Sequence, residues 1–475
     1  APANGAPSQA GPFAVVTLLF FSWGFITVMN DVLLPYLKES FTLTYLQAGL
    51  IQFAFFSAFF VVSLIYYAFS RRGVDPIQRL GYKWFIAVAL VVCALGCTLF
   101  WPASVANSYP FILTALFLLA TGVTLLQISA NPYAAVLGKP ENASARLNLA
   151  QGFNSLGTTL APILGGLLLY KVFASEDEGS LQSVQIQYLI YAGVSLGLAV
   201  LVAMSKLPAI EATESAPAPA SGALGFPQLR LGMGAIFLYV GAEVAIGSYL
   251  VNFLGDPNVM GWPESDANVY LAYYWGGAMI GRLCGAVALS GGLCVKRKAV
   301  FMPLIAFVLV ALVYVMTGLD FDGGSLVVEL APLQSIAPFP LLVAGCLLVF
   351  ILGRGSAAWT LFWFSVCLAG MLVVAATAGG RVAMWAAVGA GLFNSIMWSN
   401  IFTLSIDGLG EQTPQGSSLL VMMIVGGALF PLLMGAAADA VGVQRAFFVP
   451  VLSYAYIAFF GVWSARRIAR EGAAA

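Results

Sequence analysis

Among the charged side chains within or at the ends of long apolar segments, we single out Asp31, Glu243, Arg282 and Asp439. An ionisable group in hydrocarbon is costly, so its presence there indicates a function unless another group explains it. For Asp31 and Glu243 we favour a function. Arg282 either neutralises an acid or anchors its segment near the aqueous surface. Asp439, beside a Gly-rich turn, is interpreted as a gate or structural residue.

Neutral polar side chains share helical faces with these acids. Gly24, Thr27 and Asp31 follow the spacing i, i+3, i+7, and Gln127 and Asn131 share a face of another segment. Amides donate to and accept from hydroxyl groups, and aromatic rings cover apolar C–H patches, so this combination suits an uncharged polyol. The residues that we expect to bind such a ligand are Thr27, Asn30, Gln52, Gln127, Asn131, Asn148, Gln151, Asn154, Tyr239, Glu243, Trp275, Asn394 and Trp398.

The segment 145–171 has a polar side and an apolar side along its whole length. Asn148, Gln151, Ser155 and Thr158 lie on one side, and leucines and a phenylalanine lie on the other. A polar face within a membrane must contact protein or water rather than lipid. A single Ser, Thr or Asn can instead hold two helices together, but the face as a set favours the lining of a cavity.

The composition places these segments in a membrane. Of 475 residues, 61% are hydrophobic and 8% are charged, and the mean hydropathy is +0.93. A soluble fold of this length could not bury so much apolar surface, so we expect an all-α polytopic membrane protein. The net charge of zero excludes a strongly basic nucleic-acid binder. The absence of histidine removes Ser-His-Asp triads, haem ligation by His and the HExxH zinc motif.

About fourteen apolar stretches are candidate membrane spans. They lie at roughly 13–37, 46–70, 83–101, 109–137, 145–171, 184–205, 230–254, 267–291, 298–318, 338–353, 356–378, 381–405, 416–440 and 445–465. Basic residues gather in alternate connections, with 15 of the 20 on one side, which predicts that both termini are cytoplasmic. The expected parts are a flexible tail 1–12, a six-helix half 13–205, a cytoplasmic linker 206–229, a second half 230–465 and a cytoplasmic tail 466–475.

An internal repeat relates the two halves. Five residues recur at an offset of 269 positions: Gly122 as Gly391, Asn131 as Asn400, Gly157 as Gly426, Pro162 as Pro431 and Gly166 as Gly435. Gly24 pairs with Gly241 at an offset of 217 instead. The difference between the two offsets equals about the length of two helices and a connection, so we place a two-helix insertion within about 295–380. Two parallel six-helix repeats joined by a linker, related by a pseudo-two-fold axis, are the plan of the major facilitator fold.

The chain resembles the fucose–galactose–glucose:proton symporter family of the major facilitators in segments that cover most of both halves. In the first half these are WGFITVMNDVLLPYLKESFTLTYLQAGLIQFAFF, GVTLLQISANPYAAVLG and ARLNLAQGFNSLGTTLAPILGG. In the second half they are FLYVGAEVAIGSYLVNF, GLFNSIMWSNIFTLSIDGLG and QGSSLLVMMIVGGALFPLLMG. The resemblance implies ion-driven sugar uptake by alternating access.

The resemblance also implies roles for single residues. Asp31, in NDVLLP, matches the coupling aspartate of the family. The fucose branch has Glu at the position of Gln127 and Gln at the position of Glu243, so this chain is more similar to the glucose/galactose permeases. We therefore expect Asp31 and Glu243 to couple the cation. This chain departs from the family pattern in two segments. The loop YYAFSRRGVDPIQRLGYKW lacks the family's usual Pro-Ala-Gly run, and WSNIF stands where the family usually has FPTIF.

Several alternatives stay open at this point. The expected cation is a proton, but Asp31, Asn30 and backbone oxygens could also form a sodium site. N-acetylglucosamine is an alternative to glucose or galactose, and a sugar sensor without turnover is an alternative of another class. The sequence contains no GxxxxGK[ST] motif and no convergent catalytic set, so we expect neither a pump nor an enzyme. We expect no cofactor, no metal and no obligate protein partner, and a bacterial inner membrane as the location.

Overall fold

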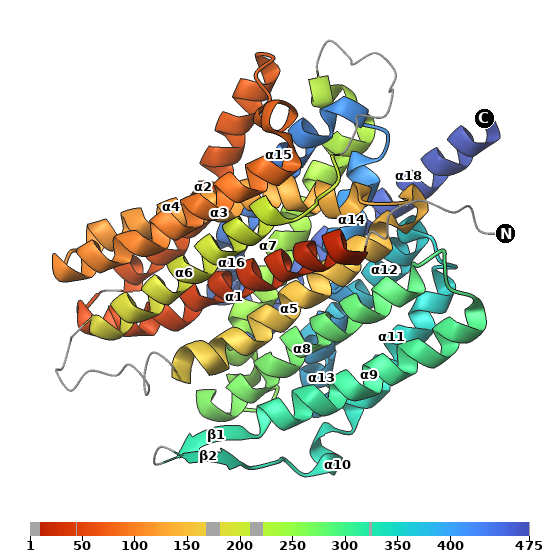
Figure 1. Cartoon of the computed structure of the whole chain (residues 1–475). Helices are drawn as coiled ribbons and strands as arrows, with labels where there is room; N and C mark the ends of the chain where they lie inside the picture. The colour runs from red at the N-terminus through yellow and green to blue at the C-terminus, as the bar shows by residue number, and fades with distance from the viewer. Residues whose placement is uncertain (1–9, 44, 168–180, 210–221, 323–324, 475) are drawn as a thin grey trace. The chain divides into compact units, whose positions relative to one another are not determined.

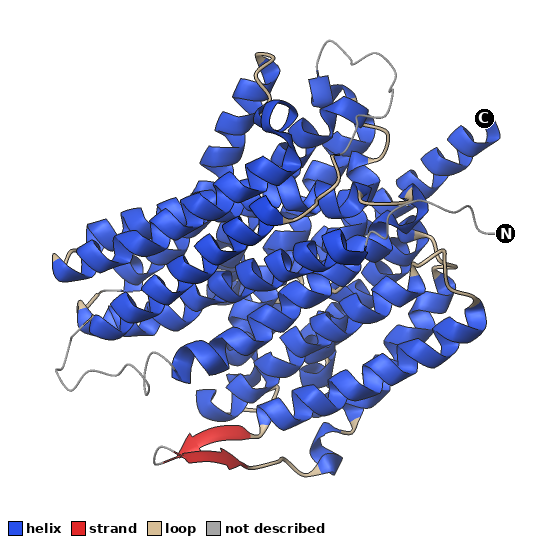
Figure 2. Cartoon of the chain, in the orientation of Figure 1, coloured by secondary structure: helices blue, strands red, loops and turns tan. Residues whose placement is uncertain are grey.

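The computed structural model describes the chain at residues 10–43, 45–167, 181–209, 222–322 and 325–474. Nearly all of this part is helical (Figure 2). A bilayer offers no water to peptide groups, so an isolated spanning segment satisfies its N–H and C=O groups within a helix. Twelve helical segments in the described ranges are long and apolar enough to cross a membrane.

The chain forms two compact units. The first consists of Ala1–Ala223 and Gly408–Met422, and the second of Leu224–Asp407 and Met423–Ala475. Figure 1 labels the helices and strands of both units.

The first unit is a helix bundle. Its helices are α1 (Ala10–Ser40), α2 (Tyr45–Arg71), α3 (Pro76–Val105), α4 (Tyr109–Val136), α5 (Ala143–Leu167), α6 (Gln182–Met204) and α15 (Thr413–Met422). Helix α3 packs against α4 and α6, α1 packs against α5, and α2 packs against α4. The short helix α15, which comes from the second half of the sequence, packs against α2 and α4.

The second unit contains the remaining elements. They are α7 (Pro227–Gly255), α8 (Glu264–Ala288), α9 (Val295–Thr317), β1 (Leu319–Asp322), β2 (Ser325–Val328), α10 (Leu333–Ile336), α11 (Pro338–Leu352), α12 (Ala357–Thr377), α13 (Gly380–Asn394), α14 (Met397–Ile406), α16 (Gly426–Val441), α17 (Val443–Ala446) and α18 (Val449–Ala474). Helix α12 packs against α13 and α18, α8 against α13, and α7 against α16 and α18.

The helices of the two units pack against one another in the same pattern. Helix α12 packs in its unit as α3 does in the first, α8 as α2 does, and α7 as α1 does. Helices α9 and α11 have no counterpart in this pattern, so they are the inserted pair. They are joined through the antiparallel hairpin β1–β2 and α10, which extend beyond the end of α9 (Figure 1). The predicted fold class, with a two-helix insertion in the second half, is thereby confirmed.

Three local features were not predicted. No strand was predicted where the hairpin β1–β2 lies, although Asp-Gly-Gly at 322–324 is a typical hairpin-turn sequence. Gly323 and Gly324 themselves lie outside the described residues. The stretch predicted as one span at 381–405 is interrupted between α13 and α14, and the stretch at 416–440 is interrupted between α15 and α16.

The repeated glycines lie at equivalent helix crossings. A Cβ atom at Gly157 on α5 would overlap the carbonyl oxygen of Phe21 on α1. The repeat-related Gly426 on α16 would overlap the carbonyl oxygen of Phe237 on α7 in the same way. Glycine lets two helix backbones approach closely in a membrane, where small residues favour packing. The internal repeat thus marks one helix crossing in each unit.

Gly157→Ala is expected to destabilise the protein by about 1–3 kcal/mol, because the overlapping atom belongs to backbone that cannot rotate away. Gly197→Ala is the matched control, since Gly197 is also helical and a Cβ there would have no neighbour within 4 Å. Thermal unfolding of both purified variants in detergent measures the difference. Equal midpoints would contradict the role assigned to the crossing.

Candidate functional site

Buried amides connect α4 and α5 in the first unit. Asn131 and Asn148 are fully buried, and Gln151 is nearly so. The Nε2 of Gln151 donates to Oδ1 of Asn131 at 3.4 Å, and the Nδ2 of Asn131 donates to the carbonyl of Gln127 at 2.9 Å. The structure therefore brings these predicted residues of α4 and α5 together, with the half-buried Gln127 at the edge of the group.

Two amides of α5 serve the helices themselves. Asn148 donates to the carbonyl of Ser144 in its own helix at 2.8 Å. Asn154 donates to the carbonyl of Phe20 on α1 at 2.9 Å, and so joins α5 to α1 beside the crossing of these helices. For Asn154, helix packing explains the buried amide.

Helix α1 carries three of the predicted residues. The hydroxyl of Thr27 is buried and has no hydrogen-bond partner in the described part of the chain. Asn30 and Asp31 lie within α1, but their side chains are outside the described residues. Gln52 lies half-buried on α2 of the same unit.

A buried ion pair joins α7 to α8 in the second unit. Nη2 of Arg282 lies 3.4 Å from Oε1 of Glu243, and both side chains are about nine-tenths buried. The Nε of Arg282 also donates to the carbonyl of Ser395 at 3.1 Å, between α13 and α14. The interruption of this span frees a carbonyl that the buried guanidinium can use. Arg282 therefore neutralises an acid, one of the two roles considered for it.

Two tyrosines hold Asn394 beside this pair. The hydroxyl of Tyr454 on α18 donates to Oδ1 of Asn394 at 2.7 Å. The Nδ2 of Asn394 donates to the hydroxyl of Tyr274 on α8 at 2.9 Å, and that hydroxyl donates to the backbone carbonyl of Glu243 at 3.1 Å. One chain of hydrogen bonds thus links α7, α8, α13 and α18. Sequence reasoning named Asn394 but missed both tyrosines, because neither belongs to a run of polar residues at helical spacing.

Tyr239 lies one helical turn before Glu243 on α7 and is 1% exposed. Its hydroxyl faces the carboxylate of Glu243 and the guanidinium of Arg282, and it forms a regular hydrogen bond with neither. A buried donor without a partner is costly, by about 1–3 kcal/mol, unless a water or ligand satisfies it. Tyr239 is therefore the group of this cluster whose hydroxyl a ligand could bond beside the ion pair.

The other predicted residues of the second unit lie as follows. Trp398 is buried and stacks on Phe402, with ring centroids 6.0 Å apart. Trp275 is half-buried and meets Tyr274 edge-on at 5.0 Å. Asp439 is exposed near the end of α16 and forms no ion pair with any described residue.

A buried acid that sequence reasoning missed lies at the start of α3. Asp75 accepts hydrogen bonds from the Tyr66 hydroxyl at 2.8 Å and the Ser70 hydroxyl at 2.6 Å, and from two backbone N–H groups of α3. Gln415 of α15 donates to Ser70 at 3.2 Å and accepts from the backbone N–H of Ala223 at 2.6 Å. Asp followed by Pro is a typical start of a helix, and this signal could have identified Asp75 as a cap.

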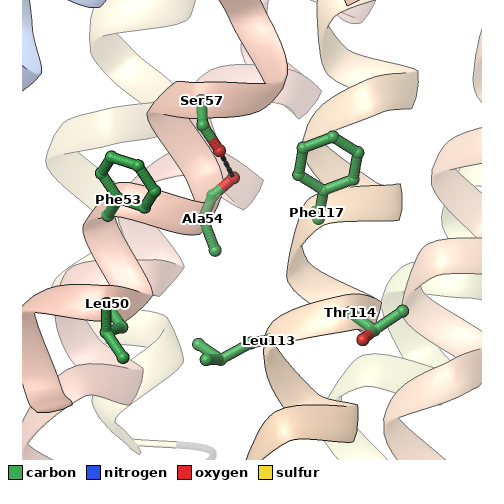
Figure 3. Close-up of a pocket in the computed structure, with 7 residues that line it drawn as sticks. All are labelled: Leu50, Phe53, Ala54, Ser57, Leu113, Thr114 and Phe117. Atoms are coloured by element: carbon green, nitrogen blue, oxygen red, sulfur yellow. Dashed lines mark hydrogen bonds between the residues drawn. The ribbon is translucent and has the colours of Figure 1, made fainter. Parts of the chain in front are cut away.

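A hollow of about 350 Å³ lies between α2 and α4 (Figure 3). Its walls are Leu50, Phe53, Ala54, Ser57, Leu113, Thr114 and Phe117. The hydroxyl of Ser57 donates to the carbonyl of Ala54, and that of Thr114 donates to the carbonyl of Pro110, each within its own helix. The wall is therefore apolar, and it offers a sugar few hydrogen-bonding groups.

Comparisons with known proteins agree with this architecture. Residues 13–423 match the family model of the Major Facilitator Superfamily. A glucose/galactose transporter of Brucella abortus is 42% identical over 450 residues, which cover 94% of this chain and 92% of that protein. The L-fucose-proton symporter of Escherichia coli is 30% identical, over 94% of this chain and 92% of that protein. The crystal structure of the transporter FucP in the outward conformation is 28% identical, covers 96% of this chain and 99% of that chain, and has a TM-score of 0.74.

Glu243→Gln is expected to destabilise the protein by about 3–5 kcal/mol, because it leaves the buried guanidinium of Arg282 without its counter-charge. Adding Arg282→Met removes the second charge and should restore much of the loss. Asp439→Asn, an exposed acid, is the control and should have no effect. Thermal unfolding in detergent gives the comparison. A double variant less stable than Glu243→Gln alone would refute the ion-pair account.

Proposed function

This chain belongs to the Major Facilitator Superfamily and, within it, to the fucose–galactose–glucose:proton symporter family, and we propose that it takes up a hexose such as glucose or galactose together with a proton. The observation that carries the proposal is the 42% identity, over 94% of the chain, to a protein named as a glucose/galactose transporter. We further propose a bacterial inner membrane location, with halves 13–205 and 230–465, a linker 206–229 and both termini in the cytoplasm.

The chemistry of the buried polar groups supports a neutral, hydroxyl-rich substrate. In the first unit, the amides of Gln127, Asn131 and Gln151 form a group on α4 and α5 that carries no charge. Amides can both donate to and accept from sugar hydroxyls. We assign these three residues, with the unpartnered hydroxyl of Thr27, to sugar binding, and we assign Asn154 to the packing of α5 on α1.

In the second unit we assign Tyr239 to sugar binding and Asn394 to the support of the site. The hydroxyl of Tyr239 forms no regular hydrogen bond with Glu243 or Arg282, which it faces, whereas both polar atoms of Asn394 are bonded to tyrosines. Trp275 and Trp398 supply aromatic faces of the kind that cover the C–H patches of a sugar ring.

Glu243, one of the two acids predicted to couple the cation, is paired with Arg282. Protonation of Glu243 would remove the counter-charge of the buried Arg282, which is costly in a low-dielectric interior. Glu243 therefore suits a role as an acid that stays ionised and positions Arg282. We assign the coupling proton to Asp31, on its match to NDVLLP and its position in α1.

Uptake of labelled D-glucose into proteoliposomes under an inward proton gradient tests the function. We expect accumulation that a protonophore abolishes. Asp31→Asn should lose accumulation but keep exchange of labelled for unlabelled sugar, because it removes the proton site and leaves the sugar site intact. Accumulation by Asp31→Asn would contradict its role. If accumulation requires sodium, the coupling cation is sodium. If only N-acetylglucosamine is transported, the substrate is that sugar. If sugar binds without exchange, the protein is a sensor and not a transporter.

Tyr239→Phe is expected to weaken the apparent sugar affinity by about 5- to 10-fold, the value of one hydrogen bond. It should change stability little, since the lost hydroxyl forms no regular hydrogen bond with Glu243 or Arg282. Tyr454→Phe is the matched control, because that hydroxyl holds Asn394 and its loss should lower the thermal midpoint. Competition uptake and thermal unfolding of the two variants separate binding from support. Unchanged affinity in Tyr239→Phe would argue against its assignment.

A further inference from the structure

The inserted helices end in a cluster of cations that the proposed sugar transport does not use. Lys296 and Arg297 are exposed in the first turn of α9, and Arg354 is exposed in the connection from α11 to α12. Helices α9 and α11 pack against each other and are joined at their other ends through the hairpin and α10, so the three cations lie at the same end of the pair (Figure 1). We call these three residues the basic rim.

No acid of the described residues pairs with the basic rim. The sequence contains no Asp or Glu between Asp266 and Asp320, or between Glu329 and Asp407. Within the described residues, none of the four ion pairs includes a residue of the rim. The neighbouring Lys298 instead donates to the carbonyl of Ala288 at 2.8 Å, at the end of α8. The charge of the rim is therefore open to an anion from outside the chain.

Exposed apolar side chains continue from the basic rim along both helices. On α9 these are Val300, Phe301 and Leu304, and Val300 is 62% exposed. On α11 they are Leu348 and Ile351, and Ile351 is 70% exposed. Among the candidate spans of the described chain, α9 is the least buried. A ligand with an anionic head and an apolar tail would match this surface along its length.

We propose that the basic rim binds the headgroup phosphate of an acidic phospholipid, whose acyl chains lie along α9 and α11. Lys and Arg at a membrane surface attract anionic headgroups, and Arg binds phosphate oxygens in a bidentate geometry. The apolar side chains below the rim favour a lipid over free phosphate, because free phosphate has no apolar part to contact them. On the proposed orientation this lipid belongs to the cytoplasmic leaflet. The site itself depends neither on that orientation nor on the sugar.

The test uses the full chain purified in detergent and supplied with phosphatidylglycerol, phosphatidylcholine or inorganic phosphate. The variant is Lys296→Gln, Arg297→Gln and Arg354→Gln combined. The matched control removes three exposed cations elsewhere, with Lys206→Gln, Arg466→Gln and Arg470→Gln combined. The thermal midpoint and the number of lipids retained in native mass spectrometry are measured. In phosphatidylcholine the rim variant should unfold at the wild-type midpoint, which shows that it folds.

We expect phosphatidylglycerol, but neither phosphatidylcholine nor phosphate, to raise the midpoint of the wild type and the control. The rim variant should lose this rise and retain phosphatidylglycerol at least about tenfold more weakly, since each cation near an anionic surface contributes. An undiminished rise in the rim variant, an equal loss in the control, or the same rise with inorganic phosphate would overturn the proposal.

Discussion

A guanidinium group buried among the helices of the second unit needs a counter-charge and acceptors, and the surrounding structure supplies both. Glu243 on α7 provides the charge, and the carbonyl of Ser395, at the interruption between α13 and α14, provides an acceptor. Tyr274 ties the backbone of Glu243 to Asn394, which Tyr454 holds from α18. Four helices are thereby fixed around Arg282. In a bilayer interior this arrangement is needed, because a buried charge without partners is too costly to keep.

The same reasoning separates supporting groups from groups that are available to a ligand. Asn154 and Asn394 are buried amides whose hydrogen bonds go to the chain itself, so their presence is explained by packing. The buried hydroxyl of Thr27 has no partner in the part of the chain that the structure describes, and the Tyr239 hydroxyl faces Glu243 and Arg282 without a regular hydrogen bond to either. Other buried side-chain atoms in the described residues also lack a partner, among them the hydroxyls of Ser63 and Tyr188, so an unsatisfied hydroxyl alone does not mark a binding site. Thr27 and Tyr239 are assigned to sugar binding because Thr27 shares a helical face with Asp31 and Tyr239 lies one turn before Glu243.

Much of the fold could be predicted from the sequence, because apolar length and helical period are local properties. The polar faces of α4 and α5, and the insertion between equivalent helices, follow from spacing alone. The use of each amide could not be predicted, since Asn154 and Gln151 lie on one helix three positions apart and meet different neighbours. The partner of Arg282 and the roles of Tyr274 and Tyr454 depend on how helices far apart in sequence pack. Asp75 was missed because it lies in a connection between spans, where a charged residue is common and does not by itself indicate a function.

The central claim is that the Glu243–Arg282 pair stays ionised, so that a single acid, Asp31, carries the coupling proton. Its most direct test is the reversal potential of sugar-driven current in proteoliposomes on a solid-supported membrane, at known sugar and proton gradients without sodium. The account predicts that one positive charge enters with each sugar. A ratio of two would mean that Glu243 also exchanges a proton, and the absence of current without sodium would mean that the cation is not a proton. Either result would contradict the assignment of Asp31 as the single proton site.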